Sequence, residues 1–132
     1  MKPATRVCRF LLVLAVGAIL SCEDEPVGPS PAIYEVVLGS GPAEVSAILF
    51  LIEGGRIDSV EGIGYYTASA PYSGVAMQVL VAGPQLRGTL VRLLVPDGRA
   101  RLRAVAREIA EPGTHRLLPT SDYSLSLSRV LR

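Results

Sequence analysis

From Ile33 onward the chain consists of short apolar runs that are separated by glycine and proline. This pattern is typical of an all-β domain, because glycine supplies positive φ angles and proline presets a turn. The sequence predicts strands at 33–38, 46–53, 56–60, 62–69, 74–82, 86–95, 99–109 and 122–131. Seven or eight short strands over residues 33–132 predict a single antiparallel β-sandwich.

Three details of the pattern refine this prediction. Residues 47–52 are apolar at every position, which indicates a central strand that is covered on both faces, or a strand beside the crossing of two sheets. In the segment 122–131 a tyrosine and two leucines alternate with three serines, which indicates one buried and one exposed face. The Gly54-Gly55 pair lies between two strand-like runs and predicts a tight hairpin.

Residues 99–109 fit two structures. Arg99, Arg101 and Arg103 alternate with apolar residues, which favours a strand with an arginine face. Such a face could meet an anionic polymer or phospholipid headgroups, or it could simply keep an edge strand from pairing with other molecules. The apolar residues from Leu102 to Ile109 also recur at helical spacing, and a helix here would make the domain α+β. A turn of proline, aspartate and glycine directly precedes the segment, which favours the strand.

The N-terminal segment predicts export. A lysine and two arginines among the first nine residues precede an apolar run over 10–20. A membrane-spanning helix needs about 20 apolar residues, so this run is too short for a permanent span and instead suits a secretory signal. Removal of the signal takes Cys8 away and leaves Cys22 as the one cysteine of the mature chain, which excludes an internal disulfide.

The residues Ile19, Leu20 and Ser21 directly precede Cys22. These four positions resemble the lipobox of bacterial lipoprotein precursors. The resemblance implies cleavage before Cys22 and diacylation of its sulfur. Ordinary signal-peptidase cleavage, which would leave Cys22 as a free thiol, is the alternative.

This resemblance divides the chain into three parts. Residues 1–21 are the signal peptide, which is removed, and 22–32 contain the lipidated cysteine and an acidic, proline-rich tether. In extended polyproline geometry ten tether residues reach about 30 Å, and the β domain over 33–132 then follows. We expect a protein of the cell envelope that is lipid-anchored on the extracytoplasmic side, in the periplasm or at the outer membrane or cell surface.

The charge balance excludes one class of partner. After the first 21 residues, ten arginines remain against twelve acids, which gives a net charge of two negatives. Nucleic-acid binding usually shows as a basic excess or stripe, so no nucleic-acid partner is expected.

Few residues suggest catalysis. His115 is the only histidine, and it lies in a segment rich in turn residues. A hydrolytic triad or a zinc site needs several such side chains together, so we expect no enzyme, no metal site and no cofactor. Glu53, Asp58 and Glu61 lie close together in sequence, but their spacing matches no calcium loop and is typical of solvated acids at strand ends.

Tyrosines provide the candidate ligand contacts. Tyr65 and Tyr66 are neighbours in a strand, so they point to opposite faces and at least one is expected in the core. Tyr66 and Tyr72 lie on one side if the chain stays extended, and exposed tyrosines can stack on sugars or anchor an interface. Core packing is the alternative for this cluster.

Residues 86–98, Leu-Arg-Gly-Thr-Leu-Val-Arg-Leu-Leu-Val-Pro-Asp-Gly, lead into the arginine-alternating segment. Over about 50 residues this part of the chain resembles the second half of cohesin-like sandwiches, which implies a sandwich fold. The sequence thus predicts a membrane-anchored, non-catalytic binding or envelope-structural module, with an envelope protein or a polysaccharide as candidate partner. The alternative is a small carbohydrate-binding accessory domain that uses Tyr66 and Tyr72.

Overall fold

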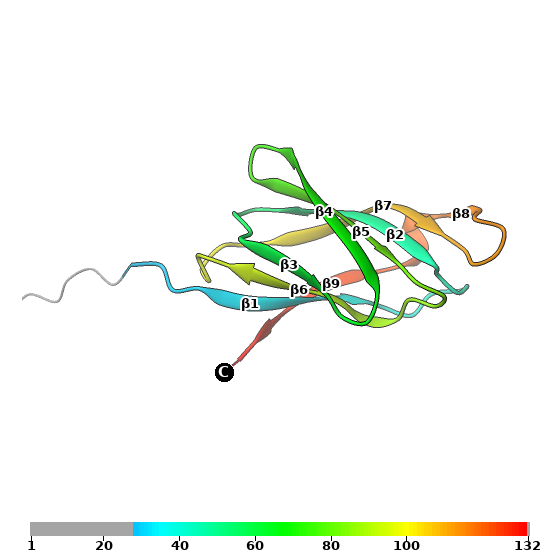
Figure 1. Ribbon diagram of the computed structural model, residues 1–132, viewed down its shortest axis with the longest axis horizontal. Coiled ribbons are helices and arrows are strands. Elements are labelled where there is room, and N and C mark those ends of the chain that lie inside the picture. Colours follow the sequence, from blue (N-terminus) through cyan, green and yellow to red (C-terminus); the bar gives the residue numbers. More distant parts are fainter. Residues whose placement is uncertain (1–27, 132) are drawn as a thin grey trace, which may run out of the picture.

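The computed structural model describes residues 28–131, which form nine β-strands in two antiparallel sheets (Figure 1). The strands are β1 (Ala32–Leu38), β2 (Ala47–Glu53), β3 (Ser59–Gly62), β4 (Tyr66–Ser73), β5 (Ala76–Ala82), β6 (Gly88–Val95), β7 (Arg103–Ala110), β8 (Leu117–Leu118) and β9 (Leu125–Val130). One sheet has the order β3-β6-β1-β9 and the other the order β4-β5-β2-β7-β8. The predicted signal segment, lipobox, Cys22 and first part of the tether lie outside the described residues.

The core lies between the two sheets. Every second residue of β2 points into the core, and Ile48, Phe50 and Ile52 are fully buried there. Val36 and Leu93 face them from the four-stranded sheet. All buried side chains in the described part are apolar, and they fall between Ala32 and Ile109. A chain that begins at Cys22 therefore contains the core and all nine strands that the structure describes.

The predicted all-β fold is confirmed. The described residues contain no α-helix, only a single 3₁₀ turn, η1 (Thr120–Asp122). The prediction of a central strand at 47–52 is also confirmed, because β2 lies between β5 and β7. The predicted cover on both faces holds only in part: on the outer face Leu51 is 3% exposed between Gln78 and Val105, whereas Leu49 is only partly buried.

The ambiguous segment is a strand, but a shorter one than the sequence predicts. β7 begins at Arg103, whereas Arg99 and Arg101 lie in the turn and loop before it. The predicted row of three arginines on one strand face is therefore wrong. The turn continues through Arg99 because the backbone N–H of Arg99 donates to the Asp97 side chain and that of Ala100 donates to the Asp97 carbonyl.

The predicted hairpin at Gly54-Gly55 is also wrong. β2 belongs to the five-stranded sheet, and β3 pairs with β6 in the other sheet, so the chain crosses between the layers at this point. The N–H of Asp58 donates to the carbonyl of Leu94 at 2.8 Å, which aligns the start of β3 with β6. Glycine is required for a close approach here, because a Cβ at Gly54 would overlap the carbonyl oxygen of Arg101.

Candidate functional site

The adjacent tyrosines Tyr65 and Tyr66 point to opposite sides, as the sequence predicts, but the predicted strand over 62–69 is wrong at Tyr65, which lies in the bend directly before β4. Tyr65 packs against the core, and its hydroxyl donates to the carbonyl of Arg87 at 3.1 Å. Tyr66 pairs in register with Ala82 on the outer face of the five-stranded sheet and is 69% exposed. Tyr66 is therefore available to a partner, and Tyr65 is a structural residue.

Tyr72 is also accessible, but it does not continue the row that Tyr66 starts. It is 54% exposed and lies at a β-bulge, where the register with β5 shifts between Pro71 and Ser73. A bulge interrupts the strict alternation of faces. Six residues of strand at a rise of about 3.3 Å separate the two tyrosines by about 20 Å, so one small ring cannot contact both.

The remaining tyrosines fix loops through their hydroxyl groups. The hydroxyl of Tyr34 donates to the Gly98 carbonyl at 3.1 Å. The hydroxyl of Tyr123 donates to the Ala43 carbonyl at 2.9 Å and accepts from the Ala43 N–H at 3.2 Å. Tyr123 precedes β9 instead of forming part of it, because this bond draws it over the loop at residues 39–45.

The outer surface of β4, β5 and the part of β2 before Glu53 forms an uncharged face. Leu49 pairs in register with Leu80, and Leu80 with Ala68, so small and apolar side chains cross three strands. Leu80 is 37% exposed, and a shallow depression of about 260 Å³ lies here. Its lining residues, which define the uncharged face together with Tyr66, are Leu49, Ala68, Ser69, Ala70, Gln78 and Leu80.

Sequence reasoning missed this face, although one signal could have found it. Residues 62–86 contain no aspartate, glutamate, lysine or arginine, in a chain of which 19% is charged. An antiparallel sheet with a solvated outer face normally carries polar residues there. A long uncharged stretch that forms two strands therefore indicates an outer face suited to a partner.

Acidic residues do not gather into a metal site within residues 28–131, where no group of three or more candidate ligands comes together. Glu53 accepts from Arg103 at 2.7 Å, and Asp58 pairs with Arg56 at 3.3 Å. Glu61 of β3 lies opposite Arg92 of β6 within the four-stranded sheet. Glu53, Asp58 and Glu61, which lie close together in sequence, therefore do not gather around one site.

His115 lies in the loop between β7 and β8. Its side chain is exposed, and its backbone adopts a φ of 55°. The neighbouring Glu111 accepts hydrogen bonds from the hydroxyl of Thr114 and the guanidinium of Arg116. The hydrogen bond from Thr114, with the charge of Arg116, holds the pKa of Glu111 below its usual value. These contacts close the loop and leave His115 outside the network.

A second depression, of about 420 Å³, lies at the end of the sandwich away from the tether. It is bordered by the loop at residues 39–45, by residues 85–88 and by Tyr123. Glu44 and Gln85 hydrogen-bond each other across it at 3.1 Å.

The described residues thus define a two-sheet β-sandwich with exposed tyrosines and an uncharged outer face. Within them no helix has the length and apolar character to cross a membrane. Comparison with known proteins finds no family model, no curated protein and no solved structure that matches the chain.

Proposed function

We propose that the protein is a lipid-anchored extracytoplasmic lipoprotein whose β-sandwich acts as a non-catalytic binding or envelope-structural module. The observation that carries this proposal is the sequence Ile19-Leu20-Ser21-Cys22 at the end of a short apolar run with a basic head. Its agreement with the lipobox pattern gives Cys22 a specific chemical role. The first strand begins at Ala32, ten residues after that cysteine.

Replacement of Cys22 tests the anchor. In cells, Cys22→Ala should release the protein from membranes and abolish the mass increase from acylation, because the thioether to the lipid cannot form. Cys8→Ala is the matched control, since it removes a cysteine from the segment that is cleaved away. Unchanged membrane fractionation and unchanged mass in Cys22→Ala would contradict the proposal.

The uncharged face supports a binding role. It presents small and apolar side chains over three neighbouring strands, and interface centres are depleted in charged residues. We expect an envelope protein to pack on this face. An arginine at Ala68 would place a charge in the middle of it, because Ala68 lies opposite Leu80 on the outer surface.

Crosslinking in cells tests this docking. A crosslinked envelope protein should be lost in Ala68→Arg and retained in Ser128→Arg, which adds the same charge to the outer face of the other sheet. Equal loss in both variants would contradict a role for the uncharged face.

A carbohydrate-binding accessory domain is the second candidate. The high exposure of Tyr66 and Tyr72 favours it, because exposed tyrosine rings stack on sugars. Their separation requires an extended polysaccharide and not a small oligosaccharide. Polysaccharide pull-down should be lost in the double variant Tyr66→Ala, Tyr72→Ala and kept in Leu117→Ala, an equally exposed position at β8 (62%). Pull-down that survives the double variant excludes this candidate.

A further inference from the structure

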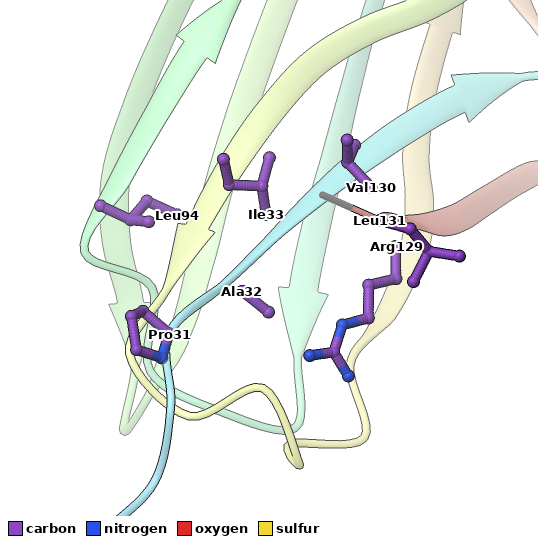
Figure 2. A pocket seen from close by; sticks show the side chains of 7 residues that line it. All are labelled: Pro31, Ala32, Ile33, Leu94, Arg129, Val130 and Leu131. Atoms are coloured by element: carbon purple, nitrogen blue, oxygen red, sulfur yellow. The ribbon is translucent and has the colours of Figure 1, made fainter.

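An apolar depression lies where the tether enters the domain. It has a volume of about 320 Å³ and is bordered by Pro31, Ile33, Leu94, Val130, Leu131 and the stem of Arg129 (Figure 2). Ile33 of β1 pairs in register with both Leu94 of β6 and Val130 of β9. Three adjacent strands therefore present apolar side chains on the outer face of the four-stranded sheet. Leu94 is 40% exposed and Leu131 is 86% exposed, so these two side chains project most.

Arg129 lines this depression, and Arg99 and Arg101 lie in the segment between β6 and β7, which begins beside the tether. Within residues 28–131 the structure gives no salt bridge to Arg99, Arg101 or Arg129. The N–H of Gly98 donates to the carbonyl of Ser30 at 2.8 Å, so the turn that carries Arg99 lies against the tether. A Cβ on Gly98 would lie 3.2 Å from the Arg129 guanidinium, which places that group at the same point.

The charges of the domain separate along its length. β1 starts and β9 ends at the tether end, as the register of Ile33 with Val130 and Figure 1 show. The tether end, taken as residues 28–32, 53–59, 73–77, 94–103 and 129–131, holds five arginines and three acids, a net charge of +2. The opposite end, taken as 39–46, 83–88 and 108–124, holds two arginines and four acids, a net charge of −2.

We propose that the tether end of the domain docks on the surface of an anionic phospholipid bilayer. This inference rests on the anchoring proposed for Cys22, which places the depression within about 30 Å of the lipid, nine residues at 3.3–3.6 Å each. Leu94 and Leu131 enter the boundary between headgroups and acyl chains, and the arginines contact phosphates while their stems cover the apolar surface.

The tether itself supplies a competing set of anions. Glu23, Asp24 and Glu25 lie close enough in sequence to reach the same arginines. Carboxylates, however, offer nothing to the exposed side chains of Leu94 and Leu131. A bilayer surface provides the apolar and the anionic component side by side, which is the combination that this end of the domain presents.

Vesicle flotation tests the docking without the lipid anchor. The chain 22–132 with Cys22→Ser contains every core residue that the structure describes and carries no acyl group. It should float with vesicles of phosphatidylglycerol and phosphatidylcholine, less with phosphatidylcholine alone, and less as salt rises. Each of the variants Arg99→Gln, Arg101→Gln and Arg129→Gln should weaken binding about fivefold. The double variant Leu94→Gln, Leu131→Gln should weaken it about tenfold.

Matched controls separate docking from general effects. Leu117→Gln changes an exposed leucine of the opposite sheet (62%), and Arg87→Gln removes an arginine from the far end. Both should bind as the unsubstituted chain does, and circular dichroism should show the same β spectrum for all variants. Absence of flotation with anionic vesicles at low salt overturns the proposal, as does equal loss in the controls. Because this chain is never acylated, its result is independent of the Cys22→Ala test in cells.

Discussion

At the scale of single residues, Gly54 is the position where the chain leaves one sheet for the other. Its φ is +103°, and a Cβ would overlap the Arg101 carbonyl oxygen. Gly54→Ala should therefore lower the free energy of unfolding by about 3–4 kcal/mol. Gly74→Ala is the control, because Gly74 has a φ of +55° and open space around it, and about 1–2 kcal/mol is expected there. Urea unfolding of both variants measures the difference, and equal losses would mean that the contact with Arg101 can relax.

The sequence could predict the orientation of single residues only in part. Alternation shows that Tyr65 and Tyr66 take opposite sides, but not which of them is buried. That choice depends on Arg87, whose backbone carbonyl accepts from the Tyr65 hydroxyl across 22 residues of sequence. The role proposed for Cys22 rests in contrast on the local lipobox pattern alone, because a signal peptide is a short linear segment.

At the scale of elements, the loop between β7 and β8 depends on the charge of Glu111. Hydrogen bonding by Thr114 and the charge of Arg116 lower the pKa of this carboxyl, whereas its desolvation acts in the opposite direction. A group whose pKa is lower in the folded state adds stability above its unfolded pKa, roughly 4.3 for glutamate, and loses that contribution as the pH falls through the folded pKa.

Glu111→Gln should therefore destabilise the protein slightly at neutral pH, and the difference from the unsubstituted protein should vanish in acid. Thermal unfolding of the two proteins across this pH range measures the effect. Glu44→Gln serves as a control for removing an exposed acid at the same end of the sandwich. A difference that stays constant down to acid pH would show that the carboxylate charge is not responsible.

The sequence patterns predicted most of the strands, but they did not predict the sheet to which each strand belongs. The two-sided apolar run of β2 marks a central strand, since burial on both faces leaves no polar alternation. The Gly54-Gly55 pair fits a hairpin, in which the next strand pairs with β2, and equally fits a crossover, in which the next strand joins the other sheet. The bond from Asp58 to Leu94 decides between these, and it joins residues far apart in sequence. β8 has only two residues, which is too short for any periodic signal.

At the scale of the whole molecule, the two sides of the sandwich differ in chemistry. The outer face of the four-stranded sheet contains the Arg92–Glu35 ion pair (2.9 Å) and the apolar depression at its tether end. The opposite sheet presents the uncharged face. A domain seated on a bilayer by the first surface would keep the second free for a partner. The two proposed surfaces are therefore compatible and could be occupied together.

The path of the chain predicts how the molecule unfolds. The chain crosses repeatedly between the sheets, since β1, β3, β6 and β9 form one sheet and the other sheet takes β2, the β4-β5 pair and the β7-β8 pair. Neither sheet is a continuous segment, and each buries its inner face only against the other.

Urea unfolding should therefore show one transition, with the far-ultraviolet signal of the strands and the near-ultraviolet signal of the tyrosines coinciding. Tyr34 reports on the four-stranded sheet, and Tyr65, packed against the core directly before β4, reports on the other. Two separated transitions would mean that one sheet persists alone, contrary to the interleaved topology.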